Sequence, residues 1–194
     1  MNYILPFVTY NAINSIIISL STSLTSTQNV FKFIINHTDS DYLIYQHQLE
    51  TTDLHNKLNI TIALIKDIIR KHCYKKNIDV EKLIDSLIKP DYEFDNNVEN
   101  DFTMINLIND TSVDISEPIK MSLLSTLEII NKINGILEKI QQKILAHQNS
   151  YFKSIIKINI HNEVNRTVHL TNIFNSRLEI LFNILQIYAV SLKI

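Results

Sequence analysis

Glycine is almost absent from this chain of 194 residues: Gly135 is the only one, and the three prolines stand at positions 6, 90 and 118. Glycine supplies the positive-φ conformations that tight hairpins and phosphate-binding loops require. The sequence accordingly contains no P-loop, no dinucleotide-binding fingerprint and no nucleophile elbow. These absences argue against nucleotide chemistry of the common kinds, and they favour long helices joined by irregular connections.

The scarcity of glycine also has a cause in the overall composition. The chain has 35 Ile, 22 Asn and 15 Lys against 4 Ala, 3 Arg and no Trp, a bias that follows AT-rich codons. Asn is the residue that best replaces glycine in left-handed conformations, and it caps helices at either end. We therefore expect Asn to occupy some positions that glycine fills in other proteins.

Cysteine is nearly as rare, since Cys73 is the only one. A single cysteine excludes an intrachain disulfide and a zinc-binding cysteine pair, and it favours a reducing compartment. We expect a cytoplasmic protein without a cofactor.

The charges are segregated along the chain. Residues 1–76 carry 7 basic and 5 acidic side chains, residues 77–118 carry 2 and 11, and residues 119–194 carry 9 and 4. The acidic segment 90–117 is expected to be a solvated loop, and it is also a place where a partner would bind if the loop is functional. Because 45% of the residues are hydrophobic, we expect one domain, 1–194, with a continuous core.

The beginning of the chain carries no charged side chain through residue 31. Apolar residues from Ile13 to Ile35 follow helical spacing, and the opposite face bears Asn, Ser and Thr. Pro6 and the polar residues interrupt the run of about 20 apolar residues that a membrane span needs. We therefore favour a helix buried in the protein, with membrane contact through residues 1–35 as the alternative.

Two further helices are predicted before the acidic segment. One covers residues 42–74 and has an inner stripe made of Leu54, Leu58, Ile62, Ile65 and Ile69. The other is short: Asn77 or Asp79 caps its start, and Pro90 stops it.

The strongest periodicity of the chain lies in residues 116–151. Ser116, Glu117 and Pro118 favour a helix start through a capping hydroxyl, an early acid and a proline in the first turn. Gly135 lies outside the apolar stripe, where a kink, a close helix contact or chance would each account for it. The stripe, which we call the seam, alternates steps of four and three residues: Ile119, Leu123, Thr126, Ile130, Ile133, Leu137, Ile140, Ile144, His147 and Tyr151.

The remaining segment ends in another long helix. Residues 152–163 alternate weakly, which is typical of a short strand or an extended connection. A final helix is predicted over residues 165–192, and its end from Ile180 to Leu192 is apolar nearly all round, as in a central helix or a subunit interface. Together these elements predict an all-α fold, an irregular up-and-down bundle of about four or five helices.

Two clusters match metal sites only in part. His47, Glu50, Asp53 and His55 would follow one helix, but a di-iron carboxylate bundle needs Glu-x-x-His on two helices. Residues 91–102 have the alternate acidic positions of a calcium loop without its glycine and its final glutamate. We therefore predict no catalytic, cofactor-binding or metal-binding residue.

Four short segments carry a family resemblance. With them the chain resembles uncharacterised all-helical proteins of AT-rich giant DNA viruses, the mimivirus-like group. The resemblance implies a viral product in the host cytoplasm, and it implies no activity, ligand or site. The segments are Pro6-Phe-Val-Thr-Tyr and Ser26-Thr-Gln-Asn-Val-Phe near the beginning, and His147-Gln-Asn-Ser-Tyr-Phe and Phe174-Asn-Ser-Arg-Leu-Glu-Ile-Leu near the end.

The sequence thus predicts a non-enzymatic helical protein that acts by protein–protein contact. A protein partner or a second copy is expected to bind through helices 116–151 and 165–192, which offer the most apolar helical surface. The near-neutral net charge of −2 predicts no nucleic-acid partner. The alternatives are a membrane-associated protein that uses residues 1–35 and a metal-dependent enzyme.

Overall fold

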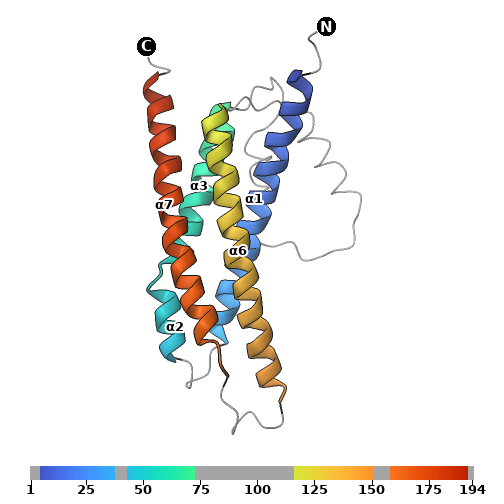
Figure 1. Cartoon of the computed structure of the whole chain (residues 1–194), viewed down its shortest axis with the longest axis vertical. Helices are drawn as coiled ribbons and strands as arrows, with labels where there is room; N and C mark the ends of the chain where they lie inside the picture. Colours follow the sequence, from blue (N-terminus) through green and yellow to red (C-terminus); the bar gives the residue numbers. More distant parts are fainter. Residues whose placement is uncertain (1–4, 38–42, 73–115, 151–157, 192–194) are drawn as a thin grey trace.

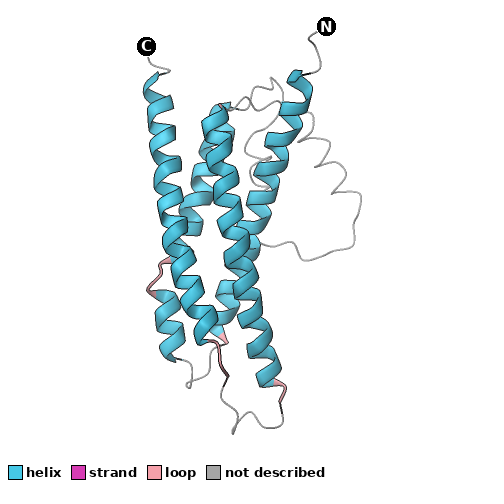
Figure 2. Cartoon of the chain, in the orientation of Figure 1, coloured by secondary structure: helices cyan, strands magenta, loops and turns pink. Residues whose placement is uncertain are grey.

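The computed structural model of the chain describes residues 5–37, 43–72, 116–150 and 158–191 (Figure 1). These residues form helices and short loops, with no strand among them (Figure 2). The expected all-α fold is therefore confirmed. The helices are α1 (Leu5–Asn36), α2 (Leu43–Glu50), α3 (Leu54–His72), α6 (Glu117–Gln148) and α7 (His161–Ser191).

The helices run up and down along the long axis of one bundle. In Figure 1, α1 runs toward one end, α2 and α3 return in succession, α6 runs in the direction of α1, and α7 returns beside it. α6 packs against α1 on one side and α7 on the other, while α1 also contacts α3 and α7 also contacts α2. Within the described ranges, α1, α6 and α7 thus run along the bundle as single helices, and α2 and α3 together form a fourth segment.

The seam of α6 forms the middle of the core. Its members from Ile119 to Ile144 are all buried, and Ile129 and Ile136 beside it are buried as well. Each buried Leu or Ile side chain contributes about 1.5–3 kcal/mol relative to an exposed one. The periodicity of residues 116–151 therefore predicted the main packing surface correctly.

Polar side chains tie α1 to its two neighbours. Ser23 Oγ donates a hydrogen bond to Asn131 Oδ1 of α6 at 2.6 Å. Gln28 Nε2 donates to Asn59 Oδ1 of α3 at 2.7 Å. Because residues 1–31 carry no charge, these contacts come from amides and hydroxyls, which fix how the helices lie against one another without burying an ion.

The helix predicted over residues 42–74 is in fact two helices. Between them, in residues 51–53, Asp53 has a φ of 54°. This left-handed conformation ends a helix, and Asp tolerates it better than most residues do. The buried Thr52 hydroxyl donates to the Leu49 carbonyl at 2.6 Å and stabilises the turn. The apolar spacing gave no sign of this break, because apolar residues continue on both sides of it.

The ends of the two long C-terminal helices differ slightly from the expectation. α6 begins after Ser116 with proline in its first turn, as predicted, but the Ser116 hydroxyl makes no capping hydrogen bond. α7 begins at His161, four residues before the predicted start at residue 165. Residues 158–160 form a loop, so the strand that the alternation allowed over residues 152–163 is absent from its described part.

Several predicted features lie outside the described residues. These are the short helix at 79–90, residues 90–115 of the acidic segment with its calcium-like spacing, and the end of the seam at Tyr151.

Gly135 lies within α6, and a Cβ added there would meet no atom of another helix within 4 Å. The close helix contact considered from the sequence is therefore absent. We predict that Gly135→Ala raises the free energy of unfolding by about 1 kcal/mol, because Ala loses less backbone entropy in a helix. Urea unfolding followed by circular dichroism measures this change.

Leu137→Ala is the matched control, since Leu137 is wholly buried two residues further along the same helix. We expect it to lower the free energy of unfolding by about 2–5 kcal/mol. A Gly135→Ala protein less stable than the wild type would contradict our description of this position.

Candidate functional site

A shallow groove of about 410 Å³ lies between α3 and α7. α3 supplies one wall through Lys57, Ile60 and Leu64, which stand three and four residues apart and so share one face of the helix. α7 supplies the other wall in the same way. Its lining residues are Asn175, Leu178, Glu179, Phe182 and Asn183.

The centre of this groove is apolar and open to solvent. Ile60 is 53% exposed and Phe182 is 49% exposed, while Leu178 beneath them is buried. Large apolar side chains that meet in an exposed depression mark interaction sites more often than isolated surface residues do. The groove is therefore the strongest candidate for a binding site in the part of the chain that the structure describes.

One positive and one negative side chain border the apolar centre. Lys57 Nζ donates to the Thr52 carbonyl at 2.7 Å, across the turn between α2 and α3. Asn175 Nδ2 donates to Glu179 Oε1 at 3.2 Å along α7. Among the described side chains, neither Lys57 nor Glu179 forms an ion pair. Both charges are thus held near the groove by neutral partners.

The end of α7 was expected to be apolar nearly all round, and the structure sorts its residues by face. Leu181 is buried in the core and Leu185 packs against the core in part. Ile180, Phe182 and Ile187 are exposed. α7 therefore keeps exposed apolar side chains after the bundle has packed, whereas most of the seam of α6 is buried in the core.

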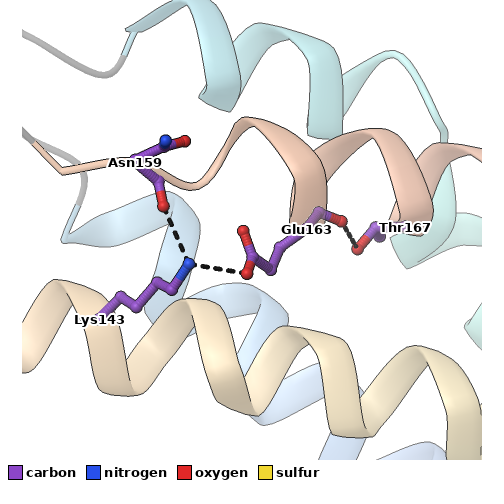
Figure 3. Close-up of polar contacts among 4 residues, drawn as sticks. All are labelled: Lys143, Asn159, Glu163 and Thr167. Atoms are coloured by element: carbon purple, nitrogen blue, oxygen red, sulfur yellow. Dashed lines mark hydrogen bonds and ion pairs between the residues drawn. The ribbon is translucent and has the colours of Figure 1, made fainter.

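A second polar cluster joins α6 to the beginning of α7 (Figure 3). Lys143 Nζ donates to the Asn159 carbonyl at 2.9 Å and to Glu163 Oε1 at 2.7 Å. Thr167 Oγ1 donates to the Glu163 carbonyl at 2.9 Å one turn further along α7. The cluster anchors the loop before α7, and its groups are bonded to one another, so we assign it a structural role.

The candidate metal ligands His47, Glu50, Asp53 and His55 do not lie along one helix, because the break at residues 51–53 separates them. Glu50 accepts a hydrogen bond from Gln46, and Asp53 accepts one from Asn56. Within the described ranges, no group of three or more His, Cys, Asp or Glu side chains is placed to hold a metal ion.

From Ile16 onward, apolar side chains of α1 are part of the core. Ile16, Ile17, Leu20, Leu24 and Phe31 of α1 are all buried. No helix in the described ranges is both long enough and apolar enough to cross a membrane.

No family model, no curated protein and no solved structure matches this chain. The resemblance to proteins of giant DNA viruses therefore stays a prediction.

Sequence reasoning missed the groove. Ile60 and Phe182 are far apart in the chain. The apolar end of the last helix from Ile180 onward was expected to be a core or interface surface, but nothing in the sequence paired it with Ile60. The available signal was that Ile60 falls outside the inner stripe of its helix, between Leu58 and Ile62. With that spacing, Ile60 is not part of the inner stripe of its helix.

The Lys143–Glu163 contact predicts a pH effect on stability. The hydrogen bond from Lys143 lowers the pKa of Glu163 from its ordinary value of 4.5. A lowered pKa in the folded state means that the stabilisation is fully present above pH 4.5 and is lost as the pH falls through the folded value. We expect Glu163→Gln to lower stability at pH 7 by less than about 1 kcal/mol and to flatten the loss of stability below pH 4.5.

Thermal unfolding between pH 7 and pH 3 measures both effects. Glu138→Gln is the control, since Glu138 is exposed on α6 and accepts its hydrogen bond from Asn134 of the same helix. An unchanged pH profile in the Glu163→Gln protein would contradict the prediction.

Proposed function

We propose that this protein is a non-enzymatic helical scaffold that acts by protein–protein contact and associates with itself through the groove between α3 and α7. The observation that carries the proposal is the exposure of Ile60 and Phe182 on facing walls of one groove. Isologous contact between identical surfaces is the commonest way in which soluble proteins form oligomers.

The self-association surface proposed here lies on α3 and α7 and leaves out α6. The sequence favoured association through both 116–151 and 165–192, but the seam of the first helix is buried against α1 and α7 from Ile119 to Ile144. The exposed apolar residues of α6, Met121, Leu124 and Leu145, are not among the residues that line the groove. α7 therefore remains in the proposed interface, and α3 takes the place of α6.

The two alternatives have less support. Membrane association through residues 1–35 would compete with the core for apolar side chains such as Ile16, Ile17 and Leu20, since these are buried. Flotation of the whole protein with liposomes tests it directly. A metal-dependent enzyme would need a ligand set, and elemental analysis of the purified protein tests that alternative.

We expect light scattering of the purified protein at micromolar concentration to give a mass above the 22.6 kDa of one chain. Phe182→Glu is expected to shift the protein to the monomer, because it places a charge in the apolar centre of the proposed interface. Phe182 is half-exposed, so the substitution spares the core.

Met121→Glu is the matched control, because Met121 is an apolar residue of similar exposure, at 58%, outside the groove. It is expected to leave the mass unchanged. A wild-type protein that stays monomeric would rule out the self-association that we propose.

A further inference from the structure

The walls of the groove between α3 and α7 carry opposite charges. Lys57 stands on the α3 wall together with Ile60 and Leu64, and Glu179 stands on the α7 wall together with Leu178 and Phe182. The groove therefore has one positive wall and one negative wall, and apolar side chains stand on both.

Such a surface is complementary to itself. A two-fold rotation about an axis along the groove places the α3 wall of one copy opposite the α7 wall of the other. The positive side then meets the negative side twice, and the apolar centres meet each other. A copy of this chain thus satisfies both the charge pattern and the apolar centre of the groove.

We propose that two copies of this chain form a symmetric dimer in which Lys57 of each copy pairs with Glu179 of the other across the joined grooves. Phe182 of each copy packs against Ile60 and Leu64 of the other. This inference rests on the proposed self-association, and it adds the symmetry, the pairing and the number of copies.

Both charged groups have bonding capacity left for this pairing. An ammonium group has three donors, and Lys57 gives the Thr52 carbonyl one of them. A carboxylate has two acceptor oxygens, and Asn175 bonds to Oε1 of Glu179. The contacts that hold the two side chains within one chain therefore need not break when the dimer forms.

The charge pattern favours a second copy over a membrane surface. Anionic lipid headgroups attract clusters of basic residues. Among the described residues, Lys57 is the one basic side chain that lines the groove, and Glu179 balances its charge. A partner with one sign of charge would be attracted on one wall and repelled on the other.

The test is a charge-reversal and mixing experiment, followed by analytical ultracentrifugation. Lys57→Glu alone places like charges in both pairs, and so does Glu179→Lys alone. We expect each variant to raise the dissociation constant of the dimer by roughly tenfold to a hundredfold. The double variant restores the homodimer, because the two charges have exchanged walls.

Mixing the two single variants is the most specific part of the experiment. In a dimer of one Lys57→Glu chain and one Glu179→Lys chain, both pairs again join opposite charges. We expect this mixture to form a heterodimer with nearly wild-type affinity, although neither variant dimerises well alone. Glu179→Lys leaves the turn at Thr52 intact, so its effect stands even if Lys57→Glu destabilises that turn.

Lys139→Glu and Glu138→Lys are the controls, because both residues are exposed on α6 and do not line the groove. Neither substitution is expected to change the dissociation constant. A wild-type dimer whose affinity the groove variants leave unchanged, or a mixture that stays monomeric, would overturn the reciprocal pairing and leave self-association in place. A monomeric wild type would overturn both.

Discussion

The burial of the seam of α6 is the interaction on which the other helices depend. Ile130, Ile133, Leu137 and Ile140 are each wholly buried near the middle of this helix. α1 and α7 make their most extensive helix contacts with α6, and α2 and α3 join the bundle through α1 and α7. Removal of the seam would therefore take away the surface against which α1 and α7 pack.

The same core explains why the candidate site lies on the surface. Where the structure describes polar side chains inside the bundle, many are threonines whose hydroxyl donates to the carbonyl four residues earlier, as at Thr27, Thr126 and Thr171. Such bonds satisfy a buried hydroxyl within its own helix and leave no donor directed at a ligand. Binding through the groove between α3 and α7 instead uses apolar side chains that the bundle leaves uncovered.

How far the sequence predicted the structure depends on the range of each interaction. The seam repeats within one helix, so its spacing alone predicted which face of residues 117–148 is buried. The break at Asp53 depends on one backbone angle, which no periodicity reports, and the groove depends on how two distant helices meet. Among the described residues, the positive φ belongs to Asp53, while Gly135 lies in ordinary helix.

Native-state hydrogen exchange tests the central role of α6 most directly, because amide protection reports the free energy needed to open each helix. We expect amides near Ile130 and Leu137 to exchange only through global unfolding. Amides of α2 and those near Ile187, where exposed side chains leave less packing, are predicted to exchange through smaller openings. Exchange in the middle of α6 as fast as in α2 would contradict the claim that its seam holds the bundle together.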